Sequence, residues 1–436
     1  AVLTALLPWL RGQVSREKRL IATVQDDETM LRFVCSADAP RLAALGTSCP
    51  DHFLRTKIKP LYIAWDPARE DAAALKAKLA AGLTQYRQDY AAYYQRCRRA
   101  DSPAMRDANP TVILIPGVGM IAFGKDKSES RVTAEFYTCA VEVMRGAEAI
   151  DEYVAIAEQE AFDIEYWLLE EAKLKRMPPE KELARQVIVV VGAGSGIGRA
   201  CALGLLADGW HVALLGRRVD ALQATADAAA AADGAAASRA MVLPCNVADD
   251  MEVAVAFAAI KERFGRLDLL FNNAGGGLAA KTPDQVTAAE WRQVVDVNLN
   301  GAFYCLSQAF KMMKEQTPKG GRIINNGSIS ATTPRPGSIA YTATKHAVSG
   351  LTKAAALDGR PFDIAVGQID IGNAASDMTA RMVDGVLQAD GSMRPEPRMD
   401  LAAVVDTLLA MVRLPLTANV LFTTVMATQM PFVGRG

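Results

Sequence analysis

Histidine is the scarcest chemically useful residue in this 436-residue sequence, which holds only three, His52, His211 and His346. The three positions lie more than 130 residues apart. A catalytic zinc site commonly recruits two or three imidazoles, at close spacing or across one sheet. We therefore expect no multi-histidine metal centre and predict that the protein needs no metal.

Cysteine and long apolar runs are also scarce. The seven cysteines are scattered, without a Cys-x-x-Cys pair, so we expect reduced core thiols in a cytoplasmic protein. The longest apolar run, residues 253–260, is far shorter than the roughly 20 residues of a membrane-spanning helix. The apolar residues 1–10 lack a basic leader and a small-residue cleavage site, so we expect no secretion signal. The chain begins with Ala, as a truncated or processed chain would.

An excess of charge of either sign is missing too. The 48 Lys and Arg residues nearly balance the 49 Asp and Glu residues, which leaves a net charge of −1 and a pI of about 6.4. No surplus of positive charge is available to hold a nucleic acid. With 50% hydrophobic and 22% charged residues, the composition is that of a folded protein with large cores. At about 150 residues per domain, the length predicts roughly three units or two larger ones.

The first half, residues 1–183, has a mixed pattern that predicts a smaller α/β domain. We expect helices over 69–99, 129–145 and 150–175, a strand over 111–115, and a helix-breaking linker at Pro178-Pro179.

From residue 184 to residue 436, short runs rich in β-branched residues alternate with helix-length amphipathic segments. Such repetition, with strands apolar enough to be covered on both faces, predicts an α/β fold of the Rossmann type with a doubly wound, seven-stranded parallel sheet. The expected strands cover residues 186–191, 211–215, 241–245, 267–271, 322–326, 364–369 and 420–424.

A glycine-rich turn follows the first of these strands and opens a helix. Its glycines let the backbone approach a pyrophosphate, whose charge is met by the free N–H groups at the helix start. The place of this turn between a strand and a helix favours a dinucleotide site over a purely structural turn. We expect contacts from Gly192, Ser195, Gly196, Ile197 and Gly198.

The second strand ends at Arg217 and Arg218, with no acid nearby. A carboxylate at this point usually accepts from the ribose hydroxyls of NAD(H), whereas a 2′-phosphate prefers guanidinium. We therefore expect NADP(H) as the preferred cofactor and keep NAD(H) as the alternative, since two solvated surface arginines would look the same in the sequence.

Tyr341 and Lys345 are four residues apart and share one face of an expected helix. A cation close to a phenol favours the phenolate, so Tyr341 could exchange a proton with an alcohol or carbonyl near neutral pH. Ser328 lies thirteen residues upstream of Tyr341. It follows an expected strand, and the loops at the carboxyl ends of parallel strands face the ligand crevice.

Two further motifs are Asn272-Asn273-Ala274-Gly275 and the helical Asn298. Together with the glycine turn, Ser328 and Tyr-x-x-x-Lys, in this order, they make residues 186–436 resemble a short-chain dehydrogenase/reductase. The resemblance implies that the chain is an oxidoreductase of a small carbonyl or alcohol, and that it forms a homodimer or homotetramer.

The same resemblance implies roles for individual residues. Tyr341 would be the general acid/base, and Lys345 would hold the nicotinamide ribose and favour the Tyr341 phenolate. Ser328 would bind the substrate oxygen, and Asn298 would anchor a water that relays protons. The implied cofactor contacts are Tyr341, Lys345, Arg217, Arg218, Asn246, Val247, Asn273, Ala274, Gly275, Gly372 and Ala374.

The sequence departs from this family pattern at three places. Val191 replaces a threonine before the first glycine, Asn246 replaces an aspartate near the adenine, and residues 370–373 replace Pro-Gly. In the family, the region equivalent to residues 374–397 closes over substrate. Arg335 is expected to line the crevice, either solvated or facing an acidic substrate group.

Residues 1–183 resemble the aldolase part of bifunctional rhamnulose-1-phosphate aldolase/alcohol dehydrogenases. The matching stretches are residues 46–57, 116–120 and 160–167. That family's metal-binding histidines would precede Ala1, so we expect a structural or assembly role here. Two alternatives remain: a bifunctional sugar-phosphate aldolase/lactaldehyde dehydrogenase, and a nucleotide-binding scaffold with weak activity.

Overall fold

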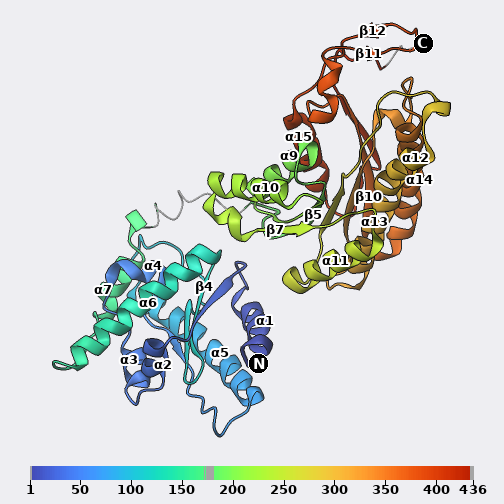
Figure 1. The fold of residues 1–436 in the computed structure, drawn as a ribbon. Helices are drawn as coiled ribbons and strands as arrows, with labels where there is room; N and C mark the ends of the chain where they lie inside the picture. The colour runs from blue at the N-terminus through green and yellow to red at the C-terminus, as the bar shows by residue number, and fades with distance from the viewer. Residues whose placement is uncertain (1, 171, 173–180, 433–436) are drawn as a thin grey trace. The chain divides into compact units, whose positions relative to one another are not determined.

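The computed structural model of the chain describes residues 2–170, 172 and 181–432. Contacts divide the chain into two compact units, Ala1–Pro179 and Glu180–Gly436 (Figure 1). The expected linker at Pro178-Pro179 lies outside the described residues. Within the described part, no helix combines the length and the apolar character that a membrane span needs.

The first unit is built on a mixed four-stranded sheet in the order β1-β4-β3-β2. β3 and β4 form an antiparallel hairpin, β1 pairs antiparallel with β4, and β2 pairs parallel with β3. The strands are β1 Ile21–Gln25, β2 Leu61–Tyr62, β3 Val112–Ile115 and β4 Gly119–Gly124. The strand expected over 111–115 is confirmed.

Helices cover both faces of this sheet. Alternate residues of β3 point to opposite sides: Ile113 and Ile115 pack with α1 and α5, whereas Val112 and Leu114 pack with α2, α3 and α6. This burial on both faces explains why the strand is apolar at every position. The helices are α1 Val2–Val14, α2 Glu28–Val34, α3 Ala39–Leu45, α4 Phe53–Thr56, α5 Ala72–Cys97, α6 Lys127–Glu148 and α7 Glu158–Glu165.

Two expectations for this half are wrong. The helix expected over 150–175 begins only at Glu158, because residues 150–157 are not helical and Tyr153 turns inward to donate to the Gly46 carbonyl at 2.9 Å. Residues 171 and 173–175 of the expected range lie outside the described residues. The thiols are free, but not all lie in the core, since Cys35 and Cys139 are exposed. Cys35 caps the carboxyl end of α2, a surface position.

A buried polar cluster holds α5 and α7 together in the first unit. Lys57, in the left-handed backbone region at φ 57°, places its ammonium 3.7 Å from the Tyr90 ring centroid and donates to the Asp107 carbonyl. Glu165 accepts hydrogen bonds from Tyr90 at 2.6 Å and Tyr93 at 3.2 Å. Burial lowers the pKa of Lys57 to about 8 and raises the pKa of Glu165.

The stability of the first unit should rise as the pH rises above 8, because Lys57 loses its proton there. The folded chain releases the Lys57 proton at lower pH than the unfolded chain, whose lysines titrate near 10.4, so the folded state gains stability through that window. Between pH 7.0 and 9.5, the free energy of unfolding of the unchanged chain should rise by about 2 kcal/mol more than that of Lys57→Met. Urea unfolding at both pH values measures this difference. The control is Lys59→Met, which changes an exposed lysine two residues away. The prediction would be contradicted if the free energy of unfolding changed with pH by the same amount in the unchanged chain and in Lys57→Met.

The second unit is built on a seven-stranded sheet in the order β13-β10-β9-β8-β5-β6-β7, with every neighbouring pair parallel. The predicted fold class and all seven expected strands are confirmed. The strands are β5 Val187–Val191, β6 His211–Gly216, β7 Ala240–Pro244, β8 Leu269–Asn272, β9 Gly321–Asn326, β10 Ile364–Gly372 and β13 Phe422–Met426.

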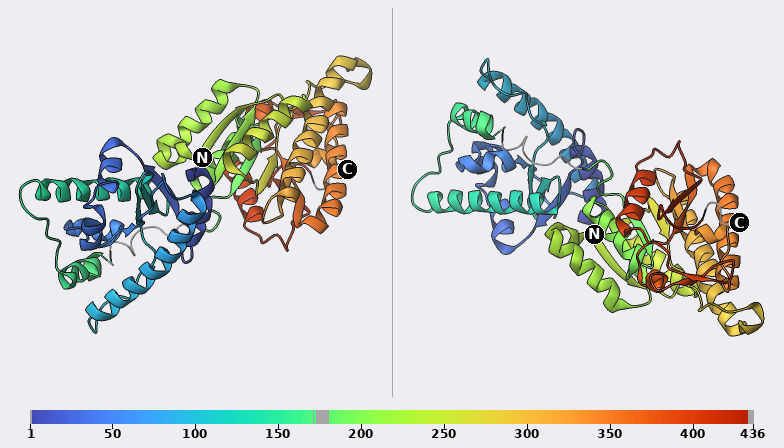
Figure 2. Two further views of the ribbon diagram at one scale, coloured as in Figure 1. Left: turned by 90° about the horizontal axis from the view of Figure 1, so that it is seen from below. Right: turned by 90° about the horizontal axis from the view of Figure 1, so that it is seen from above.

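The strand order reverses between β5 and β8, which makes their carboxyl ends the point where ligands bind in such sheets. Helices form a layer on each face of the sheet (Figure 1), and Figure 2 shows these layers from two other sides. α9 Gly196–Ala207, α10 Val219–Ala232 and α15 Leu401–Val412 cover one face. α11 Asp250–Phe264, α13 Gly301–Glu315 and α14 Ile339–Gly359 cover the other.

The second unit also contains smaller elements. α12 Ala288–Val295 begins with a capping box between Thr287 and Glu290 and continues through a π-helical turn, Asp296–Asn300, into α13. A short hairpin, β11 Val386–Leu387 and β12 Met393–Arg394, lies in the segment between β10 and α15.

Candidate active site

Two neighbouring cavities open at the carboxyl ends of the central strands of the second unit. The first cavity, of about 610 Å³, contains the glycine turn, and the second cavity, of about 600 Å³, contains Ser328. The residues that line both are Tyr341, Ile371, Asn373, Asp377, Met378 and Thr379. Tyr341 therefore stands where the two spaces meet.

The glycine turn leads from β5 into α9 along the wall of the first cavity. Gly192 and Gly196 have φ values of 79° and 49°, in the left-handed region that favours glycine. Gly198 does not line the cavity but lies against the turn, since a Cβ there would be 2.2 Å from the Gly192 carbonyl oxygen. The first-turn N–H groups of α9 are thus held close to the cavity, the arrangement that suits a phosphate.

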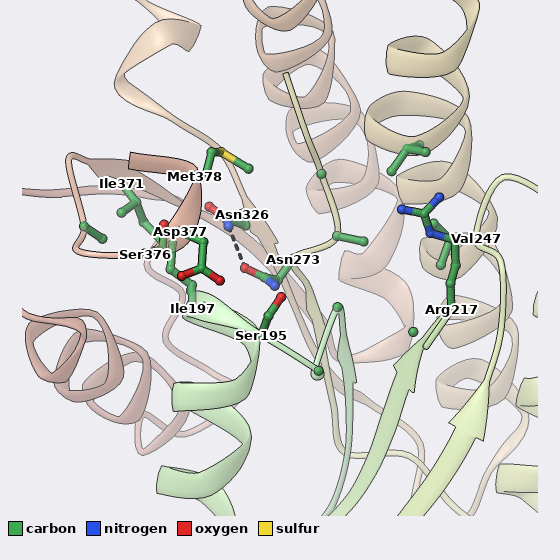
Figure 3. A pocket seen from close by; sticks show the side chains of 18 of the residues that line it. Ser195, Ile197, Arg217, Val247, Asn273, Asn326, Ile371, Ser376, Asp377 and Met378 are labelled. Carbon is green, nitrogen blue, oxygen red and sulfur yellow. Dashed lines mark hydrogen bonds between the residues drawn. The ribbon is translucent and has the colours of Figure 1, made fainter. Parts of the chain in front are cut away.

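Two asparagines tie the glycine turn to the next strands. The Asn273 side chain donates to the Val191 carbonyl at 3.0 Å, and the Asn326 side chain donates to Asn273 Oδ1 at 2.8 Å (Figure 3). The backbone of Val191 thus accepts from Asn273, although valine lacks the hydroxyl of the usual threonine. Asn326 was not singled out in the sequence, because only its position at the end of β9 brings it here.

The far end of the first cavity is formed where β6 and β7 end. Arg217 and Arg218 are exposed and line this end together with Asn246 and Val247. Figure 3 shows Arg217 and Val247 on the side of the cavity opposite Asp377. The structure therefore brings the expected ribose and adenine contacts to one end, and Ala274, Gly275 and Ala374 line the same cavity.

The four residues expected to be catalytic come from three elements. Ser328 follows β9, Tyr341 and Lys345 lie on α14, and Asn298 lies in the π-helical turn. Ser328 and Tyr341 line the second cavity, and Tyr341 and Lys345 line the first. The Lys345 ammonium lies 5.5 Å from the centroid of the Tyr341 ring and donates to the Asn326 carbonyl at 2.7 Å.

Asn298 does not line either cavity, and its side chain is engaged by the protein. Its Oδ1 accepts from the Gly276 N–H at 2.8 Å, and its Nδ2 donates to the Gly276 carbonyl at 2.8 Å and to Thr344 Oγ1 at 3.1 Å. It therefore holds the loop after β8 against α14, beside Lys345.

Asp370, one of the departures from the family pattern, holds Ser328 in place. Its Oδ1 accepts from the Ser328 N–H at 2.9 Å and from Gln368 Nε2 at 2.8 Å. Gly327 makes room for this contact, because a Cβ there would lie 2.0 Å from Asp370 Oδ1. Burial raises the pKa of Asp370.

The segment after β10 contributes residues that the sequence did not reveal individually. Ser376, Asp377 and Met378 reach the first cavity from the side opposite Arg217 (Figure 3). Gly372, an expected cofactor contact, does not line this cavity and packs against β13, where its Cβ would lie 2.8 Å from Met426 Cβ. The sequence indicated residues 374–397 as a closing segment, but no motif marks which side chains turn inward.

Arg335 lines the second cavity, as expected, but it is neither solvated nor directed only at the cavity. Its Nη2 lies 2.5 Å from Glu396 Oε2 and 2.8 Å from Asn373 Oδ1. Glu396 had no signal in the sequence, since it lies 61 residues from Arg335.

Comparison with known proteins gives two family matches. The model for the second domain of class II aldolase matches residues 1–174, and the short chain dehydrogenase model matches residues 186–386. An uncharacterized oxidoreductase of Bacillus subtilis, YuxG, is 35% identical over 369 residues, which are 84% of this chain and 53% of that protein. The chain thus spans about half the length of this relative.

Other relatives match a shorter part of the chain. Levodione reductase of Leifsonia aquatica is 30% identical over 244 residues, 53% of this chain and 90% of the reductase. A crystal structure of acetoin dehydrogenase YohF from Salmonella typhimurium is 28% identical and covers 56% of this chain and 95% of its own, with a TM-score of 0.48. By its residues 186–386, the chain belongs to the short-chain dehydrogenase family, with a class II aldolase second domain ahead of them.

Proposed function

We propose that the second unit is an oxidoreductase that interconverts a small-molecule alcohol and its carbonyl with a nicotinamide cofactor. The observation that carries this proposal is the position of Tyr341, which lines both the cavity of the glycine turn and the cavity of Ser328. A proton donor between a dinucleotide site and a substrate site is what reduction of a carbonyl requires.

The residues of the first cavity fit a dinucleotide. The pyrophosphate would lie against the start of α9 and the turn formed by Gly192 and Gly196, whose φ values are positive. A 2′-phosphate on the ribose would lie near Arg217 and Arg218. When bound, the nicotinamide would supply the hydride. Lys345, whose ammonium is already fixed by the Asn326 carbonyl, would donate to the nicotinamide ribose.

The side chains of the second cavity would handle the proton and orient the substrate. In the direction of reduction, the carbonyl carbon gains a hydride, and its oxygen takes a proton from the Tyr341 hydroxyl while Ser328 Oγ donates a hydrogen bond to it. The proton is then replaced from solvent, and oxidation of the alcohol reverses each step. Asn298 would act by holding the Gly276 loop beside Lys345. The side-chain nitrogen of Asn298 already donates to Gly276 and Thr344, so a water that relays protons would bind other atoms of Asn298.

The two arginines at the end of β6 should select NADP(H). The double variant Arg217→Ala/Arg218→Ala should raise the Kd for NADP⁺ roughly tenfold to a hundredfold, because it removes charge-assisted hydrogen bonds to the 2′-phosphate, and should leave the Kd for NAD⁺ within about threefold. Fluorescence titration with both nucleotides measures this. Arg263→Ala, at an exposed position on α11, is the control. Tighter binding of NAD⁺ than of NADP⁺ by the unchanged chain would show the assignment to be wrong.

A second candidate function, sugar-phosphate aldol cleavage, rests on the family match of residues 1–174. We propose instead that this unit has a structural or assembly role in a homo-oligomer. Within the described residues, no group of three His, Cys, Asp or Glu side chains is placed to hold a metal. Aldol cleavage by the purified chain, together with bound metal, would favour the alternative.

A further inference from the structure

Large apolar side chains form much of the lining of the second cavity, beside the hydroxyls of Ser328 and Tyr341. These side chains are Leu278, Val286, Ile329, Ile339, Ile371, Met378 and Met382. Among its described lining residues, only Arg335 and Asp377 carry a formal charge. The chemistry of the substrate therefore depends on whether Arg335 is available to it.

Arg335 is held by Glu396, a carboxylate that the fold buries almost completely. The exposed fractions of the two side chains are 15% for Arg335 and 1% for Glu396. Glu396 Oε2 lies 2.5 Å from Arg335 Nη2 and also accepts from Asn373 Nδ2 at 2.8 Å, while Oε1 accepts from Gln388 Nε2 at 3.0 Å. The Glu396 N–H donates to the Met382 carbonyl at 2.9 Å, which fixes the backbone.

Arg335 cannot easily leave Glu396 to pair with an anionic substrate. Burying a carboxylate is costly unless it is paired and hydrogen-bonded, and removing one partner of a buried pair is strongly destabilising. An anionic substrate that drew Arg335 away would weaken the pairing of Glu396. An anion that approached Arg335 without displacing Glu396 would face two carboxylates, Glu396 behind the guanidinium and Asp377 on the cavity wall.

We propose that Glu396 is a specificity-determining residue, which engages the charge of Arg335 so that the site selects uncharged, largely apolar alcohols and carbonyls over carboxylates. The inference rests on the proposed function and names its substrate class. Glu396 acts through Arg335 and does not line the cavity itself.

The test compares two eight-carbon methyl ketones, 2-octanone and 7-oxooctanoate, of which only the second carries a carboxylate. With NADPH or NADH, the unchanged chain should have the higher kcat/KM for 2-octanone. Glu396→Gln keeps the size and the hydrogen-bonding oxygen of the side chain but removes its charge. This variant should raise the ratio of kcat/KM for 7-oxooctanoate to that for 2-octanone about tenfold, as expected when a guanidinium becomes available to a carboxylate.

Two further variants separate charge from structure. Asp390→Asn removes a negative charge from the same segment, where Asp390 pairs with Arg394 in solvent, and should leave the ratio unchanged. Adding Arg335→Met to Glu396→Gln should return the ratio to its original value. A rise in the ratio with Asp390→Asn, or a rise that persists without Arg335, would overturn the proposal.

Binding of octanoate, measured by calorimetry, gives a readout that needs no turnover. Glu396→Gln should bind octanoate about tenfold more tightly than the unchanged chain. Equal binding, or a preference of the unchanged chain for 7-oxooctanoate, would overturn the role of Glu396 while leaving the oxidoreductase intact. If no alcohol or carbonyl is turned over but octanoate binding changes as expected, the proposed function falls and the charge assignment stands.

Discussion

Tyr341→Phe should lower kcat for carbonyl reduction roughly a thousandfold, within the range that positioned general acids contribute. The substitution removes the hydroxyl that donates the proton and keeps the ring, which lies against Lys345 at the junction of the two cavities. Because the glycine turn and Arg217 are untouched, the Kd for NADPH should stay within about threefold. Steady-state kinetics and nucleotide fluorescence titration measure the two quantities on the same preparation.

Tyr304→Phe is the matched control for this variant. Tyr304 lies on α13, half-buried, and lines neither cavity, so loss of its hydroxyl should leave kcat unchanged. Unchanged turnover in Tyr341→Phe would remove the proposed acid/base. Nucleotide binding by the unchanged chain without turnover of any alcohol or carbonyl would instead favour the scaffold alternative.

The sheet of the second unit was predictable because its strands are buried on both faces. Val187 to Val191 is apolar at every position, since alternate residues pack under α9 and α11. The glycine turn and the Tyr341–Lys345 pair were predictable for a related reason, because each is a local pattern whose spacing already sets its geometry. Local patterns of this kind need no knowledge of distant contacts.

Two contacts of the site escaped prediction because they join residues far apart in the sequence. Asp370 reaches Ser328 across 42 residues, and Glu396 reaches Arg335 across 61. Their pairing depends on how β9, β10 and the segment after β10 meet in three dimensions. The late start of the helix expected over 150–175 has the same origin, since Tyr153 turns away to form a hydrogen bond with Gly46.

Gly198→Ala should raise the Kd for NADPH about a hundredfold. The new Cβ would lie 2.2 Å from the Gly192 carbonyl oxygen and 2.7 Å from Asn273 Nδ2. The first of these atoms is backbone and cannot rotate away, so the turn itself must move relative to the start of α9. Loss of one or two charge-assisted hydrogen bonds to the pyrophosphate, each worth about 1.5–3 kcal/mol, accounts for the expected weakening.

The comparison with Gly350→Ala separates this effect from a loss of folding. A Cβ at Gly350, on α14 in the same unit, would meet nothing within 4 Å, so that variant should gain roughly 0.5–1 kcal/mol of stability and bind NADPH as before. Gly198→Ala should cost about 1–3 kcal/mol, less than the 5–15 kcal/mol typical of a folded domain, so it should remain folded by circular dichroism. If folded Gly198→Ala binds NADPH within threefold of the unchanged chain, the pyrophosphate does not lie on this turn. In that case the first cavity would hold its ligand in another way, and Tyr341 would no longer stand between a cofactor and a substrate.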